Sequence, residues 1–308
     1  MKIAMFGTGA MGTMFSAYLS RVGDVTMFTH RAAQADAIRR EGIVLETEEG
    51  AVTARPEAIV SGTPADQTFD LIVVLVKAYQ TADVLEDNRR CISDGTAVLT
   101  LQNGLGNADT LARFVRRENI LVGTSTINSR RLSDTSAHQH GNVGFTNIGS
   151  ISGNRALADK IGALFTEAGF NVNVTDNIEG LVWRKVFVNM TCNPLTALFD
   201  RNIKIVENET ARGLYRRELE EAVAVANASG QNFDLDEVLG YVKEVLLNSR
   251  EGTTSMRTDI AAGRPTEIDY LNGAVARIGE KYGIPAPHCR MMADLIHILE
   301  TRDTVSES

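Results

Sequence analysis

The sequence predicts an α/β protein in which a doubly wound, mainly parallel sheet precedes an all-helical C-terminal domain. Apolar runs of strand length alternate with helical patterns from residue 3 to about residue 174. Such alternation is typical of βαβ units and therefore of a parallel sheet. From residue 176 onward the pattern is helical. We therefore expect one domain at residues 1–174 and a second at residues 175–308.

The bulk properties exclude several classes of protein. The 308 residues suffice for two ordinary domains with sizeable cores. The net charge of −8, from 31 basic and 39 acidic residues, argues against a nucleic-acid surface. No apolar run reaches the roughly 18 residues of a membrane span, and the N-terminal run is too short for a signal peptide. Three cysteines without a C-x-x-C motif favour reduced thiols and a cytoplasmic setting.

A glycine-rich segment follows the first expected strand. Ile3 to Phe6 is predicted as a buried strand, and a second strand is expected from Val25 to Phe28, after a helical pattern. Between the first strand and that helix lies a G-x-G-x-x-G motif, made of Gly7, Thr8, Gly9, Ala10, Met11 and Gly12. Its glycines permit a tight turn, close approach of a pyrophosphate and packing of helix on strand. The motif predicts a Rossmann-type dinucleotide-binding domain, with the anion at the helix N-terminus.

The end of the second expected strand bears on the choice of dinucleotide. NAD enzymes place an acidic residue there, which accepts a hydrogen bond from the ribose 2′-hydroxyl. Here the segment is Thr29-His30-Arg31 and has no acid. Arg31 could hold a 2′-phosphate by charge-assisted hydrogen bonds, although an exposed arginine at a helix start is the simpler alternative. We favour NADP(H) as the cofactor.

Polar residues follow two further expected strands. Phe69 to Val76 and Ala97 to Leu101 have the near-continuous apolar character of parallel strands covered on both faces. Lys77 follows the first, and Asn103 comes shortly after the second. Ligands bind at the carboxyl ends of such strands, so both are candidate cofactor contacts. A solvated lysine and a simple Asn-Gly turn are the alternatives.

The rest of the first half contains edge elements. Residues 43–60 alternate like a hairpin around Glu49-Gly50, and residues 127–150 look like antiparallel edge pieces. A further strand at 120–126, a helix at 156–168 and a strand at 170–174 complete the domain. His138 and His140 form a His-x-His pair, but no third ligand is evident nearby. We expect surface histidines and no metal site.

The most informative stretch of the second half is an apolar helix at residues 178–199 that carries one polar stripe. Lys185, Asn189 and Asn193 are four residues apart and fall within a narrow arc. A helix that is apolar on most sides is buried, and its polar stripe must face polar groups. The alternative is a solvated lysine with two amides bonded to backbone. Pro194 should kink or split this helix.

Further helices are expected at residues 209–229 and 235–249, then a polar break at 250–256. Residues 263–269 should open another helix, and two final helices should run to about residue 299, followed by a polar tail at 302–308. Ser255 could simply cap the helix after it. Glu267 has a simple interpretation as an acid in a first helical turn, next to a Thr266–Asp269 cap.

Taken together, these motifs resemble the ketopantoate reductase (2-dehydropantoate 2-reductase) family over almost the whole chain. No single motif is specific, but the set is. The segments that carry the resemblance are the glycine motif at 7–12, Leu75 to Gln80, Gln102 to Gly106, Trp183 to Lys185 with Asn189, Asn193 to Ala197, Thr254 to Met256, and Thr266 to Gly273.

The resemblance implies NADPH-dependent reduction of 2-dehydropantoate to (R)-pantoate by a Rossmann domain and a helical domain. It implies that Lys185 is catalytic, as the general acid, and that Glu267 contacts the cofactor or organises the site. Asn189, Asn193 and Ser255 would bind the substrate. The residues implied to contact the cofactor are the glycine motif (Gly7, Thr8, Gly9, Ala10, Met11, Gly12) with Arg31, Lys77 and Asn103.

Two alternatives to this function stay open. The segment from Asp200 to Lys204 departs from the pattern of the family, in which an asparagine after this helix helps to hold the substrate. The chain is therefore also compatible with a reductase of another 2-keto or 2-imino acid. A non-catalytic NADP-binding sensor would keep the glycine motif but would not need the Lys-Asn-Asn stripe. The expected partner is a small-molecule 2-keto acid; the oligomeric state is not readable, and a homodimer is one option.

Overall fold

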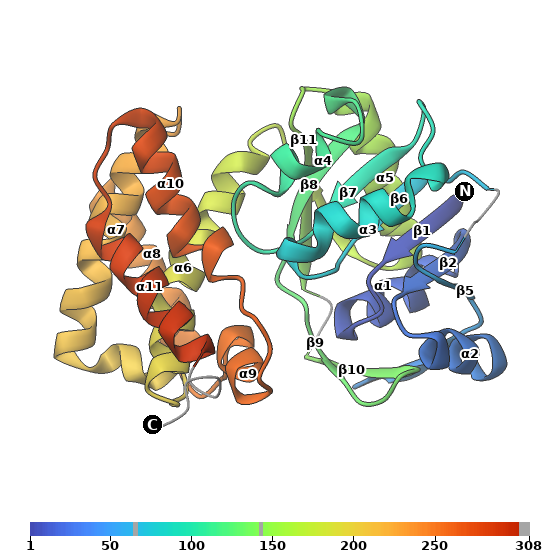
Figure 1. Cartoon of the computed structure of the whole chain (residues 1–308), viewed down its shortest axis with the longest axis horizontal. Coiled ribbons are helices and arrows are strands. Elements are labelled where there is room, and N and C mark those ends of the chain that lie inside the picture. The colour runs from blue at the N-terminus through green and yellow to red at the C-terminus, as the bar shows by residue number, and fades with distance from the viewer. Residues whose placement is uncertain (64–66, 142–143, 302–308) are drawn as a thin grey trace. The chain divides into compact units, whose positions relative to one another are not determined.

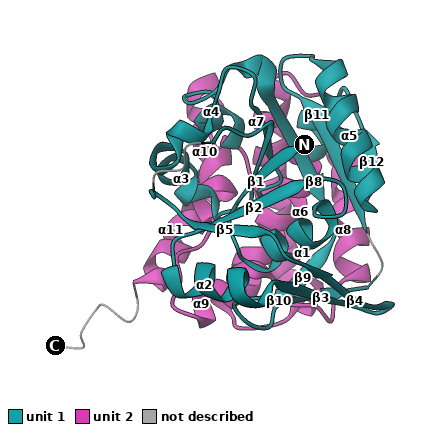
Figure 2. Cartoon of the chain, turned by 90° about the vertical axis from the view of Figure 1, so that its right-hand side faces the viewer, with its two compact units in different colours: residues 1–102, 107–181 teal, residues 103–106, 182–308 magenta. Residues whose placement is uncertain are grey.

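The computed structural model describes residues 1–63, 67–141 and 144–301, so the expected polar tail at 302–308 lies outside the described residues. The chain divides into two compact units (Figure 2). Unit 1 comprises residues 1–102 and 107–181, and unit 2 comprises residues 103–106 and 182–308. The boundary thus falls at residue 181, within a helix, and a four-residue segment from the first half belongs to unit 2.

Unit 1 is built on an eight-stranded sheet with the order β12-β11-β8-β7-β6-β1-β2-β5. Neighbouring strands are parallel except for β11, which runs antiparallel to β8. The strands are β1 (Lys2–Phe6), β2 (Asp24–Thr29), β5 (Glu57–Val60), β6 (Leu71–Val74), β7 (Ala97–Thr100), β8 (Ile120–Ser125), β11 (Phe145–Ser150) and β12 (Asn171–Val174). All but β12 are labelled in Figure 1, and β12 is labelled in Figure 2. The predicted doubly wound α/β fold is confirmed.

Side chains of this sheet enter two separate apolar cores, one on each face. Ile3 and Met5 of β1 lie in one core, and Ala4 and Phe6 lie in the other. This is the alternation of a strand that is covered on both sides. The first core is completed by α1 (Ala10–Leu19), α2 (Ala32–Glu41) and α5 (Arg155–Ala168), and the second by α3 (Thr81–Asp87) and α4 (Asn107–Leu111).

The two segments expected as a hairpin and as edge pieces form a second sheet. Its order is β4-β3-β10-β9, from β3 (Ile43–Thr47), β4 (Gly50–Ala54), β9 (Asn128–Arg131) and β10 (Ser136–His140). The predicted hairpin around Glu49-Gly50 is present as β3 and β4, which pair antiparallel. The turn between β9 and β10 is held in unit 1, because β10 pairs with β3, both strands contact α1, and Gln34 of α2 donates to the Asp134 carbonyl.

In the described part of unit 2, residues 103–106 and 182–301, the regular elements are helices. One buried apolar core joins its helices and includes Phe187, Leu219 and Val242. The helices are α6 (Ile178–Leu198), α7 (Glu209–Ala228), α8 (Leu235–Asn248), α9 (Ser255–Ala261), α10 (Asn272–Tyr282) and α11 (Pro287–Glu300). Residues 263–269 do not open a long helix as expected. They lead into a 3₁₀ turn, Ile268–Tyr270, and α10 begins only at Asn272.

Pro194 does not split α6, which continues to Leu198. Proline has no N–H, so the carbonyl of Met190, four residues earlier, loses its helical donor. The side chain of Asn272 replaces that donor, since its Nδ2 lies 3.2 Å from the Met190 oxygen. Asn272 Nδ2 also donates to Glu218 at 2.9 Å, and both side chains are buried. The helix is therefore continuous because another helix supplies the missing hydrogen bond.

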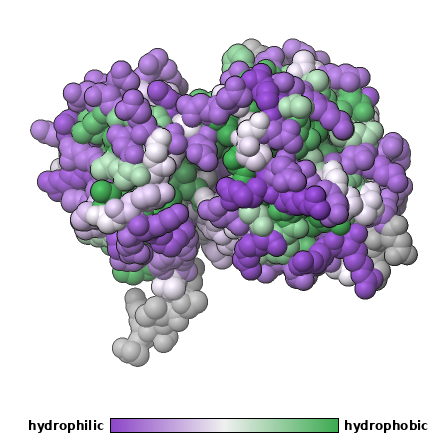
Figure 3. Space-filling model, turned by 90° about the horizontal axis from the view of Figure 1, so that it is seen from above, coloured by the Kyte–Doolittle hydropathy of each residue, from purple (hydrophilic) through white to green (hydrophobic). Residues whose placement is uncertain are grey.

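The surface is mainly polar on the face that Figure 3 shows, with smaller apolar patches between hydrophilic regions. This pattern is ordinary, because folded proteins always expose some apolar atoms. Among the described helices, none is both long enough and apolar enough to cross a bilayer.

Candidate active site

The glycine motif forms the turn between β1 and α1. Gly7 has φ +114°, and a Cβ placed there would lie 2.7 Å from the backbone of Leu75 and Val76. A Cβ on Gly12 would lie 1.9 Å from the Gly7 carbonyl oxygen, so the third glycine allows helix and turn to pack. A Cβ on Gly9, the N-cap residue of α1, would meet no described atom within 4 Å. The first and third glycines are thus required by the fold, whereas the second opens space at a helix N-terminus.

The remaining motif residues support this turn. Thr8 is buried and its hydroxyl donates to Gln34 Oε1 at 2.9 Å. Ala10 and Met11 begin α1. The sheet order places the end of β6 beside the end of β1, and the half-buried Lys77 follows β6 at the start of a 3₁₀ turn. Lys77 therefore lies at the same edge of the sheet as the glycine turn.

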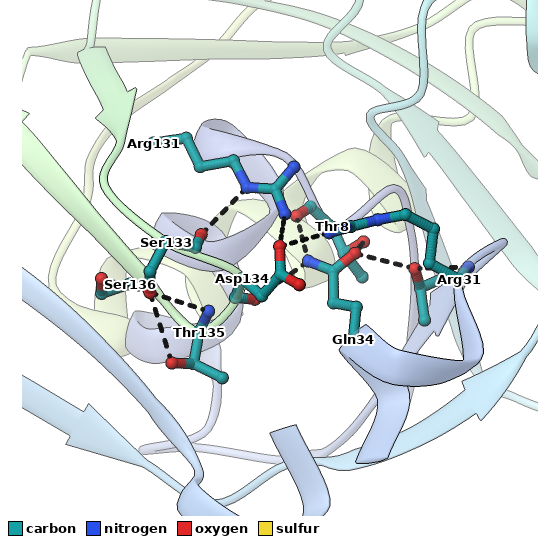
Figure 4. A network of polar contacts seen from close by, with 9 residues as sticks. Thr8, Arg31, Gln34, Arg131, Ser133, Asp134, Thr135 and Ser136 are labelled. Atoms are coloured by element: carbon teal, nitrogen blue, oxygen red, sulfur yellow. Dashed lines mark hydrogen bonds and ion pairs between the residues drawn. The ribbon is translucent and has the colours of Figure 1, made fainter. Parts of the chain in front are cut away.

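Arg31 immediately precedes α2, at the end of β2, as the sequence indicated. Its guanidinium pairs with the carboxylate of Asp134, which lies in the turn between β9 and β10. Arg131 pairs with the same carboxylate oxygen (Figure 4). The sequence had suggested no acid at this place, because Asp134 is 103 residues away along the chain. Asp134 is thus a neighbour of Arg31 that sequence patterns did not reveal.

Lys185, Asn189 and Asn193 lie on α6 of unit 2, where spacing placed them. Lys185 and Asn189 are half-buried, and Asn193 is 5% exposed. Trp183, Val186 and Phe187 surround the stripe with fully buried apolar side chains. Burial lowers the pKa of Lys185 to about 8, because an ammonium loses hydration in an apolar environment.

The carboxylate of Glu267 opposes that shift in the pKa of Lys185, since a nearby negative charge favours the ammonium. Glu267 is 9% exposed and directly precedes the 3₁₀ turn of residues 268–270. Thr266 does not form the expected cap with Asp269; its hydroxyl accepts from the backbone N–H of Ile268 at 3.2 Å. The simple interpretation of Glu267 as a first-turn acid is therefore replaced by an electrostatic pairing with Lys185.

Asn103 belongs to unit 2 because its neighbours pack on that same turn. The N–H of Leu105 donates to the Tyr270 carbonyl at 2.8 Å. Gly104 has φ +90°, and a Cβ there would lie 2.3 Å from the same carbonyl oxygen. The Asn103-Gly104 pair therefore forms a turn and also brings the backbone close to Tyr270. Asn103 and Glu267 belong to the two segments of unit 2 that this Leu105–Tyr270 hydrogen bond joins. Lys77 belongs to unit 1.

Ser255 begins α9 and is exposed, but it is not the N-cap. Thr254 has that role: its hydroxyl accepts from the backbone N–H of Arg257 at 3.3 Å. The Thr254 hydroxyl also lies 2.6 Å from that of Thr196 on α6. The alternative in which Ser255 caps the helix is therefore wrong.

His138 and His140 lie on β10, with ring centroids 4.6 Å apart. His138 Nδ1 is 3.6 Å from Glu46 on the neighbouring strand. Within residues 1–63, 67–141 and 144–301, no three or more histidine, cysteine or acidic side chains are grouped to bind a metal.

A dinucleotide fits the features of unit 1. The open space above Gly9, the N-terminus of α1 and the nearby cations Arg31 and Arg131 are what a pyrophosphate and a ribose phosphate require. Unit 2 adds a half-buried lysine beside an acid and two amides. A Rossmann-type unit combined with a unit that carries such a lysine is the combination expected of a nicotinamide-dependent oxidoreductase.

Comparison with known proteins identifies the family within this class. Residues 3–153 match the family model described as Ketopantoate reductase PanE/ApbA, and residues 177–300 match its C-terminal model. The chain belongs to the ketopantoate reductase family, which is a family of oxidoreductases.

Individual relatives cover almost the entire chain. The 2-dehydropantoate 2-reductase of Streptococcus pyogenes serotype M3 is 32% identical over 97% of this chain and 98% of its own. The enzyme of that name from Halobacterium salinarum is 32% identical over 97% and 99%. Among solved structures, D-mandelate dehydrogenase with NADH and anilino(oxo)acetate has a TM-score of 0.92 and 30% identity, covering 99% of this chain and all of that chain.

Proposed function

We propose that this protein reduces the 2-keto group of 2-dehydropantoate to (R)-pantoate with NADPH, in the cytoplasm, and that Lys185 is the general acid. In this proposal the domain at residues 1–174 binds NADP(H) and the helical domain at residues 175–308 binds the substrate. The observation that carries the proposal is the environment of Lys185. It lies half-buried in a polar stripe of an otherwise apolar helix, with Glu267 acting on its charge.

The residues that would hold NADPH are those of the glycine turn with Lys77 and Arg31, and Asn103 from unit 2. When bound, NADPH supplies the hydride that adds to the keto carbon. The electron pair of the carbonyl bond then moves to oxygen, and that oxygen needs a proton. Lys185 donates a proton from Nζ to it and becomes a neutral amine, which solvent later protonates again.

The pKa of Lys185 suits this step. With a pKa of about 8, the side chain is mainly protonated at neutral pH, yet gives up its proton more readily than an unperturbed lysine near 10.4. Glu267 prevents the pKa from falling further, so the acid form persists. Glu267 is therefore proposed to tune Lys185, in addition to any contact with the cofactor.

Asn189, Asn193 and Ser255 are proposed to orient the substrate. Amide and hydroxyl groups can bond the carboxylate and hydroxyl oxygens of a 2-keto acid without adding charge. Two of the three lie on the same helix as Lys185, at four-residue spacing, so they would set the keto oxygen against its ammonium.

The test is oxidation of NADPH, followed by its absorbance, with a panel of 2-keto acids that includes 2-dehydropantoate. We expect the highest kcat/KM for 2-dehydropantoate. Turnover with none of the acids would refute the enzymatic proposal and favour a nucleotide sensor. A higher kcat/KM for another acid would instead identify that acid as the substrate.

A second candidate, the NADH-linked reduction of a different 2-keto acid, is favoured by the segment that follows α6. Asp200 is the one described non-glycine residue with positive φ, 48°, and its carboxylate lies 2.9 Å from Arg257 Nε. In this same segment the family pattern carries an asparagine for the substrate, at the position that Ile203 occupies here. The similarity to a D-mandelate dehydrogenase with bound NADH points in the same direction. The same panel, run with both reduced nucleotides, separates the two candidates.

A further inference from the structure

At the end of β2, Arg31, Asp134 and Arg131 form a row of ion pairs in which one carboxylate lies between two guanidinium groups. The guanidinium groups of Arg31 and Arg131 share one oxygen of Asp134 (Figure 4). The three side chains are only 38–39% exposed. Arg131 ends β9 and Asp134 follows in the turn, where the Arg131 Nε also donates to the Ser133 carbonyl at 2.9 Å. The turn is thus closed by its own hydrogen bonds as well as by the ion pairs.

Gln34 holds this turn at the end of β2. Its Nε2 donates to the carbonyl oxygens of Thr8, at 3.0 Å, and Asp134, at 2.9 Å. Its Oε1 accepts from the hydroxyls of Thr8 and Thr29, both at 2.9 Å. Gln34 is 1% exposed, so these bonds are shielded from water. Asp134 is therefore tied to the glycine turn and to the end of the second strand, both within unit 1.

That location is where this fold distinguishes the two nicotinamide nucleotides. An acid at the end of the second strand accepts the ribose 2′-hydroxyl of NAD(H), and an arginine accommodates the 2′-phosphate of NADP(H). Here both groups are present and already paired. A 2′-phosphate, carrying nearly two negative charges at neutral pH, would be repelled by the Asp134 carboxylate and would compete with it for Arg31.

We propose that Asp134 is a cofactor-specificity residue that acts as a built-in counter-ion for Arg31, so that the enzyme binds NADH as well as NADPH. This inference rests on the proposed nucleotide-dependent function. Asp134 supplies, from the turn between β9 and β10, the acid that is missing after β2. When NADH binds, the Asp134 carboxylate would accept a hydrogen bond from the ribose 2′-hydroxyl. When NADPH binds, Arg31 would leave Asp134 and pair with the 2′-phosphate.

Asp134 is suited to this competition because it stays ionised. The Arg31 guanidinium beside it holds the pKa of the Asp134 carboxyl below its usual value, and Arg131 acts in the same direction. The side chain is therefore an acceptor and a negative charge throughout the neutral pH range.

The experiment compares the dissociation constants of NADPH and NADH for the wild-type protein and for Asp134→Asn, by the fluorescence of the bound reduced nucleotide. We expect the variant to bind NADPH about fivefold more tightly and NADH somewhat more weakly, since a partly exposed charge contributes on this scale. Asp134→Glu, which keeps the charge, should retain more of the wild-type ratio. Asp36→Asn is the matched control, because Asp36 is also an exposed acid paired with an arginine, Arg39, in unit 1.

The outcomes separate this inference from the proposed function. If wild-type protein binds neither nucleotide, the proposed function fails and this inference fails with it. If wild-type protein binds both and Asp134→Asn leaves their ratio unchanged, only the inference is overturned. Weaker binding of NADPH by Asp134→Asn, at an unchanged melting temperature, would also overturn it, because Asp134 would then position Arg31 for the phosphate.

Discussion

The glycine turn of unit 1 and the α6 stripe of unit 2 are built by different physical means. The turn depends on the absence of side chains: Gly12 packs its backbone where a methyl group would collide, and Gly9 leaves space. Its charged groups, such as Arg31, are partly exposed and already paired. The stripe depends on side chains that an apolar helix keeps from water, which shifts the pKa of Lys185. The first design suits binding of an anion, and the second suits transfer of a proton.

The comparison is tested most severely by Lys185→Ala. We expect kcat to fall by roughly 100-fold or more, which is the usual contribution of a general acid, while the NADPH dissociation constant stays within about twofold. Steady-state kinetics and nucleotide titration measure the two quantities. The exposed Lys243→Ala of α8 is the control. A near-normal kcat in Lys185→Ala would remove Lys185 from the mechanism.

The two glycines should separate binding from stability. We expect Gly9→Ala to weaken the binding of both nucleotides by about tenfold with little change in melting temperature, because its Cβ fills only the space proposed for the pyrophosphate. Gly12→Ala should lower the melting temperature by several degrees, since its Cβ collides with the Gly7 carbonyl. Thermal unfolding without nucleotide distinguishes them. Equal losses of stability in both variants would contradict the open space at Gly9.

Arg31→Ala should weaken the binding of NADPH much more than the binding of NADH. We expect NADPH to bind about five- to tenfold more weakly, through loss of charge-assisted bonds to the 2′-phosphate, and NADH to change by less than about twofold. Titration with each nucleotide gives both numbers. Equal losses for the two nucleotides would mean that Arg31 supports the turn rather than the phosphate.

The pH profile tests the role of Glu267. With the pKa of Lys185 at about 8, kcat/KM should fall as pH rises through that value, because the acid is lost. Glu267 raises the pKa of Lys185, so Glu267→Gln should move this alkaline limb to lower pH. The limb is measured from initial rates across the pH range. An alkaline limb that stays at the same pH, or moves to higher pH, would show that Glu267 does not raise the pKa of Lys185.

Local patterns were sufficient for the frame of the molecule and for part of its site. The strand–glycine–helix order and the four-residue spacing on α6 follow from backbone geometry, which acts within a few residues. Thr254 and not Ser255 caps α9, residues 263–269 do not open a long helix, and of the two alternatives for Pro194 the split is wrong. For Pro194 a partner distant in sequence decided the outcome, because Asn272 supplies the hydrogen bond that proline removes. Assignment of Ser255, Asn189 and Asn193 to the substrate stays a prediction.

Sequence alone determined the α/β class, the glycine turn and the presence of a lysine in a polar stripe on a buried helix. Periodicity and the steric freedom of glycine carry that information locally. Only the tertiary structure placed Asp134 against Arg31, 103 residues apart, and Glu267 where its charge acts on Lys185. Electrostatic interactions depend on distance and burial in space, and neither quantity is encoded in the spacing of residues along the chain.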